Sequence, residues 1–402
     1  MLADPPAARR TVERGAVAFV LAVALALSFF ATAASAGQQR PFGDIGLFTN
    51  VPYPGNPGGL AVDGKTLWVD TSAANLDRPF DGSSSVFAYD LGTGRLEPRN
   101  PNPIIVPKLD VAAMGLLGIA LDASGRLYIA DMNGQIVRVD PSTGESEVYA
   151  TIPTSTSTSF TSMPTADAFG PDGSLYVSDA GGEPFIWRVP PGGGQAKLWF
   201  SDPRLSGTWG ASVVGLTLDA SGDNVYFAVG NQEPQITIYR LPLRDPTASR
   251  LSAFHTYRDV VLPSCSTDPN NATDPATPIV LANCAVTPFF GAGGIAFGKS
   301  GRLYVAMFAK NQISVLDPRG VELARFPSPE ENAKLDVPVN GPFGLAFDAR
   351  GSLLVADVGD PSYGYLPGRV PPPNGTPDSR SWAVLSAWVD DTAAPLLRPR
   401  IP

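Results

Sequence analysis

The feature that most constrains the fold is a short segment that recurs six times along the chain. Each copy begins with alternating small and apolar residues, passes through a turn that contains glycine, and continues as an apolar strand. Two clear copies are Gly118-Ile-Ala-Leu-Asp-Ala-Ser-Gly-Arg-Leu-Tyr-Ile-Ala-Asp131 and Gly344-Leu-Ala-Phe-Asp-Ala-Arg-Gly-Ser-Leu-Leu-Val-Ala-Asp357. The copies start at Gly59, Gly118, Ala166, Gly215, Gly294 and Gly344. Self-similarity at such intervals is typical of solenoids and propellers.

The residues that follow each copy alternate between apolar and polar, as in strands with one buried face. Examples are Gln135-Ile-Val-Arg-Val-Asp140 and Phe185-Ile-Trp-Arg-Val189. Turns that contain glycine join these segments at short intervals, and no long helical pattern follows residue 36, which indicates antiparallel sheet. We therefore predict an all-β fold, a six-bladed β-propeller of four-stranded antiparallel blades.

The same pattern predicts how the ring of blades closes. Asp44-Ile-Gly-Leu-Phe48 precedes the first copy, and an alternating segment, Trp382–Val389, follows the last. We expect the N-terminal strand to pair with the last blade as its outermost strand. The small residues that begin each copy suit the innermost strands, where six backbones crowd around an axis.

Residues 1–36 have the pattern of a secretory signal peptide. Three arginines between positions 9 and 14 are followed by an uncharged apolar run, and Ala34-Ser35-Ala36 resembles a cleavage site. An uncleaved membrane anchor is the alternative, because the run is just long enough to span a bilayer. We expect an exported protein, periplasmic or secreted, in which residues 37–402 form a single propeller domain.

Both cysteines of the chain, Cys265 and Cys284, lie in one polar insertion at residues 259–290. An exported protein meets oxidising conditions, so we expect these two cysteines to form a disulfide. Closing a loop of about 20 residues in this way contributes roughly 3 kcal/mol in the chain-entropy account.

Composition narrows the possible functions. A single histidine among 402 residues leaves little room for histidine-based metal sites or for Ser-His-Asp catalysis. The formal net charge of -9 argues against a nucleic-acid partner, because phosphates attract basic surfaces.

The repeated cores, Gly-Leu/Ile-Ala-Phe/Leu-Asp followed by Gly-Arg/Ser-Leu-Tyr-Val-Ala-Asp, resemble those of the gluconolactonase/regucalcin (senescence marker protein) family and of related NHL-repeat proteins. The resemblance covers about residues 45–390. It implies a six-bladed propeller and metal-assisted hydrolysis of a lactone. It also implies calcium as a cofactor at the mouth of the channel, held by acidic or amide residues directly before the first-strand glycine in particular blades.

The residues at the six matching positions carry no carboxylate or amide side chain; they are Gly58, Leu117, Thr165, Val214, Gly293 and Phe343. A hard cation needs several converging oxygen ligands, some of them anionic. The residues therefore predict no metal ligand at these positions, and we expect no tight calcium site on the axis.

The loops that precede the first strands are rich in large apolar residues. If these loops surround the mouth of the channel, they form an apolar funnel with a few polar groups, which suits a small organic ligand. A channel filled by its own side chains is the alternative. The candidate ligand-binding residues are Asn56, Met114, Met163, Thr165, Trp209, Phe290 and Phe343.

Five aspartates lie in or at the ends of the predicted inner strands. Asp70, Asp131, Asp179 and Asp357 end second strands, and we interpret them as acceptors of hydrogen bonds from the backbone of the next turn. Asp167 lies inside a first strand, where a carboxylate must face water in the channel or be paired.

Two functions remain open. One is a non-catalytic exported propeller that binds a small organic ligand or a protein on its loop face. The other, implied by the resemblance, is a metal-dependent hydrolase of a lactone or a related small ester. The sequence names no catalytic residue for it. We expect a monomer that contacts a membrane only if the signal stays attached.

Overall fold

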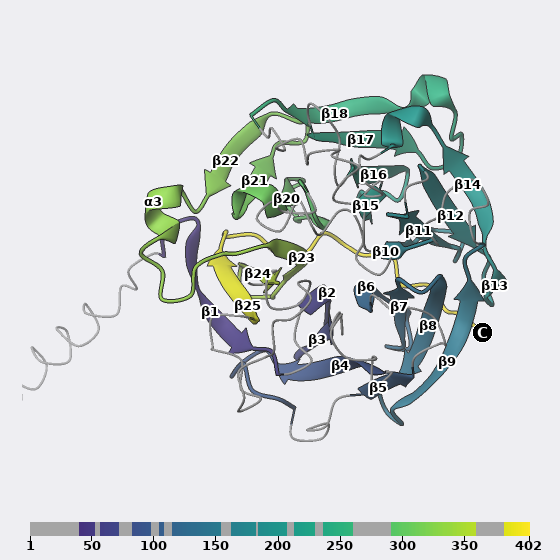
Figure 1. Cartoon of the computed structure of the whole chain (residues 1–402), viewed down its shortest axis with the longest axis horizontal. Coiled ribbons are helices and arrows are strands. Elements are labelled where there is room, and N and C mark those ends of the chain that lie inside the picture. The colour runs from purple at the N-terminus through teal and green to yellow at the C-terminus, as the bar shows by residue number, and fades with distance from the viewer. Residues whose placement is uncertain are drawn as a thin grey trace, which may run out of the picture. The chain divides into compact units, whose positions relative to one another are not determined.

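Six small antiparallel sheets stand around a central axis within residues 42–402, as Figure 1 shows. The computed structural model describes residues 40–52, 57–71, 83–97, 104–107, 115–153, 162–181, 184–206, 213–229, 236–259, 291–358 and 382–402. The predicted fold class, an all-β six-bladed propeller, is confirmed by this arrangement.

The first three blades follow the order of the sequence, with the first strand at the axis and the last at the rim. Blade 1 consists of β2 (Pro57–Asp63), β3 (Thr66–Thr71), β4 (Ser83–Asp90) and β5 (Ile104–Pro107). Blade 2 consists of β6 (Leu116–Leu121), β7 (Leu127–Asp131), β8 (Gln135–Asp140) and β9 (Glu145–Thr151). Blade 3 consists of β10 (Pro164–Phe169), β11 (Leu175–Asp179), β12 (Phe185–Val189) and β14 (Lys197–Ser201).

Blades 4 and 5 repeat this order, and blade 6 takes its outermost strand from the start of the chain. Blade 4 consists of β15 (Val213–Leu218), β16 (Asn224–Val229), β17 (Ile236–Pro242) and β18 (Ser252–Tyr257). Blade 5 consists of β19 (Ile295–Phe297), β20 (Leu303–Met307), β21 (Gln312–Leu316) and β22 (Glu322–Phe326). Blade 6 consists of β23 (Pro342–Phe347), β24 (Ser352–Asp357), β25 (Ala383–Trp388) and β1 (Asp44–Asn50).

The remaining elements are short. A two-residue strand, β13 (Gly194–Gln195), runs parallel to β9 and gives the sheet of blade 2 a fifth strand that the sequence did not predict. The helices in the described part of the chain are single turns: η1 (Pro203–Leu205), η3 (Ala248–Arg250), η5 (Phe308–Lys310) and α3 (Pro329–Asn332). None of them is long and apolar enough to cross a bilayer.

The ring closes as predicted. Strand β1 pairs antiparallel with β25, with Asp44 opposite Trp388 and Asn50 opposite Ala383. The N-terminal strand thereby completes the last blade and joins both ends of the repeat in one sheet, which leaves the ring without an unpaired blade edge at the seam.

The innermost strands approach one another so closely that Gly59 and Gly118, near the start of their strands, have no room for a side chain. A Cβ atom built on Gly59 would lie 2.8 Å from the Cα atom of Gly118. One built on Gly118 would lie 2.8 Å from the carbonyl oxygen of Thr165 and 2.9 Å from the Cα atom of Ala166. Contacts under 3 Å are not tolerated by backbone atoms. The repeated glycine of the sequence is thus required by the packing of neighbouring blades at the axis.

The hydrophobic core lies between the blades. Each pair of neighbouring blades in the described structure shares a cluster of buried side chains, from blades 1 and 2 around to blades 6 and 1. Between blades 2 and 3, for example, the Tyr128 ring packs edge-on against Tyr149 and Phe169 at centroid distances of 4.8 and 4.9 Å. Because each blade packs against a neighbour on both of its faces, inner strands such as β7 and β11 are buried along their whole length.

The C-terminal segment (residues 391–402) crosses the channel on the side away from the starts of the first strands, drawn in yellow in Figure 1. Its first residue, Asp391, supplies a carboxylate that blade 5 lacks. In blade 2 the carboxylate of Asp122 accepts hydrogen bonds from the backbone N–H groups of Ser124 and Arg126 and from the Tyr128 hydroxyl.

Blade 5 has Gly298 at the position that corresponds to Asp122. There Asp391 places its carboxylate against Gly298 and accepts hydrogen bonds from the Ser300 backbone and hydroxyl and from the Tyr304 hydroxyl. The turn of blade 5 is therefore completed by a residue from the far end of the chain.

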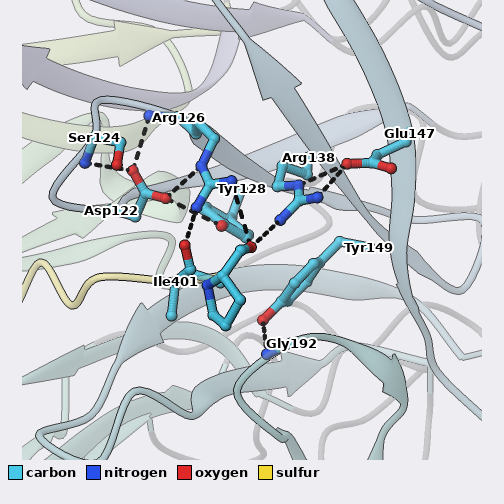
Figure 2. A network of polar contacts seen from close by, with 10 residues as sticks. Asp122, Ser124, Arg126, Tyr128, Arg138, Glu147, Tyr149, Gly192 and Ile401 are labelled. Atoms are coloured by element: carbon cyan, nitrogen blue, oxygen red, sulfur yellow. Dashed lines mark hydrogen bonds and ion pairs between the residues drawn. The ribbon is translucent and has the colours of Figure 1, made fainter.

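The other end of this segment is held by two arginines of blade 2, as Figure 2 shows. Arg126 donates to the carbonyl oxygen of Ile401 and pairs with Asp122 at 2.7 Å. Arg138 donates to the carbonyl oxygen of Pro402 at 2.9 Å and also pairs with Glu147. The segment is thus fixed to blade 5 at one end and to blade 2 at the other.

We predict that Asp391→Ala lowers the free energy of unfolding by about 1–3 kcal/mol, because it leaves the Ser300 N–H and the buried Tyr304 hydroxyl without an acceptor. The measurement is a urea unfolding curve. Asp336→Ala, at an exposed aspartate, is the control and should change little. The double variant Gly298→Asp with Asp391→Ala should recover part of the loss, since it restores the carboxylate within the turn. Equal stability of the wild type and Asp391→Ala would contradict this account.

Candidate functional site

A cavity of about 300 Å³ occupies the central channel. The first strands of all six blades form its wall, and residues 393–398 of the C-terminal segment close part of it. Most of the lining is apolar, with small residues such as Ala120, Ala168 and Ala296 only partly buried along it. The charged side chains in the wall are Asp167, Asp219 and Arg398. Arg398 is already engaged, because it donates to Asp63 at 2.6 Å and to the carbonyl oxygen of Val62.

Where the first strands begin, the channel is packed by a cluster of buried apolar side chains, which we call the axial plug. Its members are Leu117, Met132, Met163, Ala180, Val214, Phe308, Phe343 and Val358. Three of these, Leu117, Val214 and Phe343, stand at positions where the resemblance places metal ligands. Their side chains fill this end of the channel with hydrocarbon.

The only hydroxyl at those positions is also committed. Thr165 is fully buried, and its Oγ1 atom lies 3.1 and 3.0 Å from the carbonyl oxygens of Val213 and Val214 and 3.1 Å from Ser178 Oγ. A calcium ion at the position that the resemblance implies therefore does not fit the residues present. Within the described ranges, no three His, Cys, Asp or Glu side chains come together as a metal site.

The structure places some of the predicted ligand-binding residues together. Thr165 and Phe343 line the cavity, and Met163 packs beside Phe343 in the axial plug. Their role in ligand binding stays a prediction. The other candidates lie outside the described residues, as do both cysteines; they are Asn56, Met114, Trp209, Phe290, Cys265 and Cys284.

Two of the second-strand aspartates act as the sequence predicts. The Asp131 side chain accepts a hydrogen bond from the backbone N–H of Asn133 at 3.0 Å, and the Asp179 side chain accepts one from that of Gly181 at 2.8 Å. In both cases the donor lies two residues further along the chain, in the turn that follows the strand. Asp179 also accepts a hydrogen bond from the Met163 backbone N–H, and Asp357 accepts one from that of Asn340, both in the segments that lead into the first strands. The turn that follows Asp357 lies outside the described residues, so its predicted bond stays a prediction.

Asp70 is one of two exceptional carboxyl groups. It lies fully buried at the end of β3, where its Oδ1 atom accepts a hydrogen bond from the backbone N–H of Gly59, at the start of the first strand. Its Oδ2 atom is buried and has no hydrogen-bond partner in the described structure. Burial raises the pKa of Asp70 to about 7, although the backbone N–H groups of Gly59 and Gly58 favour its ionised form.

Asp167 is the other exceptional carboxyl group. Its side chain lines the cavity from β10, the residue is 9% exposed, and neither carboxylate oxygen has a hydrogen-bond partner among the described residues. Burial raises the pKa of Asp167 well above its usual range, and repulsion from Asp70 raises it further.

Sequence reasoning recognised each of these two carboxylates but did not bring them together. The signal that was available is the sequence Ala166-Asp167-Ala168, which puts an ionisable group between two small residues of a strand that packs on both sides. That Asp70 lies within electrostatic reach of it depends on the closure of the ring, which juxtaposes blades 1, 2 and 3 at the axis.

The fold and the channel together define a six-bladed β-propeller with a cavity on its axis. Among solved structures, the chain resembles the calcium-binding protein regucalcin from Agrobacterium tumefaciens, with a TM-score of 0.54 and 15% identity over 90% of this chain and 98% of that one. It also resembles a luciferin-regenerating enzyme, with a TM-score of 0.54 and 13% identity over 89% of this chain and 100% of that one.

A gluconolactonase from Xanthomonas campestris is similar at a TM-score of 0.49 and 15% identity, over 78% of this chain and 86% of that one. No protein-family model and no curated protein sequence matches the chain. The resemblance in fold to regucalcin-like propellers is thus confirmed. Sequence identities this low support a shared fold but not a shared function.

We predict that the protein becomes less stable as the pH rises from about 5.5 to 8.5. Asp70 and Asp167 have higher pKa values in the folded chain than in the unfolded chain, so folding binds protons, and their stabilising contribution is complete below the unfolded pKa. The contribution of Asp70 is lost as the pH rises through about 7, and that of Asp167 as the pH rises through its own raised pKa. Each unit of pKa difference is worth about 1.4 kcal/mol. Melting temperatures of the wild type, Asp70→Asn and Asp167→Asn measure the effect.

Both variants should show a weaker dependence on pH than the wild type. Asp223→Asn, at an exposed aspartate, is the matched control and should keep the slope of the wild type. A melting temperature of the wild type that stays constant over this range, or equal slopes for all four proteins, would count against the buried pair.

Proposed function

We propose that this protein is an exported β-propeller that binds a small organic molecule inside its central channel. The observation that carries the proposal is the cavity of about 300 Å³ whose wall comes from all six blades. This volume is at the lower end of the range for ligand sites, and a mostly apolar wall with few polar groups is typical of them. Export is supported by the sequence of residues 1–36, which lie outside the described structure.

The position of the cavity refines the earlier expectation of a funnel at the mouth. The axial plug packs the end at which the first strands begin, so the space for a ligand lies along the strands and toward the C-terminal segment. Thr165 and Phe343 then contribute to the closed end of the site, and the apolar first-strand residues contribute its sides.

We predict that filling the cavity abolishes ligand binding and leaves the fold intact. Ala120→Leu and Ala296→Leu add side-chain volume to partly buried residues of the wall. A ligand that binds only the folded state raises the melting temperature, and the rise grows with the logarithm of its concentration once that concentration exceeds its Kd. The test measures this rise for the wild type and the two variants with cyclohexanol, cyclohexylamine, δ-valerolactone and glucono-δ-lactone at millimolar concentration.

The matched control is Ala324→Leu, a partly buried alanine on the outer strand β22. The control should respond like the wild type, while the two cavity variants should not respond. No rise with any of the four compounds, or an equal rise in the filled variants, would contradict binding in the channel.

The second candidate is hydrolysis of a lactone or a similar small ester, and its support is the fold shared with regucalcin and its relatives. The residues at the implied metal positions do not favour it, because Leu117, Val214 and Phe343 are packed in the axial plug. Metal-dependent hydrolysis requires a bound cation such as calcium, whereas ligand binding in the channel does not.

We predict that millimolar calcium leaves the melting temperature unchanged within about one degree, since no carboxylate or amide side chain stands at those positions. The measurement is thermal unfolding with calcium chloride and after addition of a chelator, with magnesium chloride as the control salt. A rise of several degrees that the chelator reverses, together with calcium-dependent opening of δ-valerolactone in a pH-stat, would favour the hydrolase.

A further inference from the structure

The two unusual carboxyl groups lie against a pair of touching glycines, but only Asp167 is part of the cavity wall, whereas Asp70 is fully buried against Gly59. The Oδ2 atom of Asp70 is 2.6 Å from the place where a Cβ atom of Gly59 would stand, and Asp167 Oδ1 is 3.4 Å from the corresponding place on Gly118. Since Gly59 and Gly118 pack directly on each other at the axis, the carboxylates of blades 1 and 3 converge around the start of the first strand of blade 2.

Three oxygen atoms of this pair accept no hydrogen bond within the described part of the chain. They are Asp70 Oδ2, Asp167 Oδ1 and Asp167 Oδ2, and each is buried. An isolated buried carboxylate is costly unless it is protonated or paired. The one cationic side chain in the cavity wall, Arg398, is bonded to Asp63 and Val62 instead. The described protein thus supplies acceptors and negative charge here but no matching donor.

We infer that Asp167, with the negative charge of Asp70 close by, binds the ammonium group of a small organic cation whose apolar part lies along the channel. This inference rests on the proposed function, since it names the class of ligand for the same cavity. An ammonium group carries three N–H donors and one positive charge. Asp167 offers two free acceptor oxygens in the cavity wall, Asp70 adds negative charge from behind that wall, and the apolar wall suits a hydrocarbon body.

The site selects against other ligands of similar shape. A neutral alcohol has one donor and no charge, so it leaves one oxygen of Asp167 unpaired and the negative charge uncompensated, and a carboxylic acid in its ionised form is repelled. Hydrogen bonds to charged groups are stronger than those between neutral groups, so an amine should bind more tightly than the alcohol with the same ring. A divalent metal ion needs six or more oxygen ligands and is a distinct outcome of the test.

The experiment compares cyclohexylamine with cyclohexanol by isothermal titration calorimetry at about pH 8.5, where the amine is charged and the pH exceeds the pKa of Asp70, about 7. For the wild type we expect cyclohexylamine to bind at least about tenfold more tightly than cyclohexanol. Asp167→Asn should lose this preference and keep the affinity for cyclohexanol. Asp70→Asn is a second variant with the same expectation, and its amide oxygen is still able to accept the Gly59 N–H.

Asp223→Asn is the matched control and should retain the preference for the amine. Equal affinities of the two compounds for the wild type overturn the inference, and so does a preference for the amine that survives in both Asp70→Asn and Asp167→Asn. In either case, binding of cyclohexanol to the wild type leaves the proposed function standing. If neither compound binds the wild type, both proposals are overturned. Calcium chloride that binds the wild type and competes with cyclohexylamine, but does not bind Asp167→Asn, assigns the pair to a metal ion and also overturns the inference.

Discussion

The close approach of the six innermost strands is the constraint on which the rest of this structure depends. Where Gly59 meets Gly118, and Gly118 meets the backbone of Thr165 and Ala166, even one Cβ atom would collide with a neighbouring blade. The apolar clusters between the blades form around this contact, because the angle at which neighbouring sheets meet is fixed at the axis. A larger residue at these glycines forces the blades apart and disrupts the core on both sides.

The same crowding shapes the chemistry of the channel. Backbones in contact at the axis leave little water around a side chain, so carboxyl groups there are desolvated and their pKa values rise. In turns between strands, by contrast, Asp172 and Asp317 lie beside arginines and backbone N–H groups, and their pKa values are lowered. The number of hydrogen-bond donors around a carboxylate, set against its burial, thus decides whether an aspartate acts as a structural anion or as a group poised to bind a proton or a cation.

Much of the fold was predictable because the repeat encodes it locally. The alternation of apolar residues, the glycine turns and the early strand at Asp44–Phe48 gave six blades and their closure, all confirmed. The site was harder to predict, since it depends on contacts between distant parts of the chain. Asp70 and Asp167 belong to different repeats, and nothing in either repeat says that their carboxylates share one space. The role of Asp391 was equally hard to predict, because the sequence around Gly298 resembles an ordinary turn and does not show that Asp391 packs against it.

The C-terminal segment links the packing of blade 5 to the wall of the cavity. Asp391 completes a turn that blade 5 cannot satisfy alone, and residues 393–398 then form part of the cavity wall. Arg398 bonds to Asp63 at the end of β2, the strand that begins beside Asp70. A chain that lost the carboxylate at 391 would therefore lose one of the contacts that hold this segment against blade 5, next to the backbone hydrogen bonds between Lys299 and Thr392 and between Ala394 and Phe297. The wall of the cavity is in this way made dependent on the integrity of blade 5, and a ligand held in the channel would in turn stabilise the segment that encloses it.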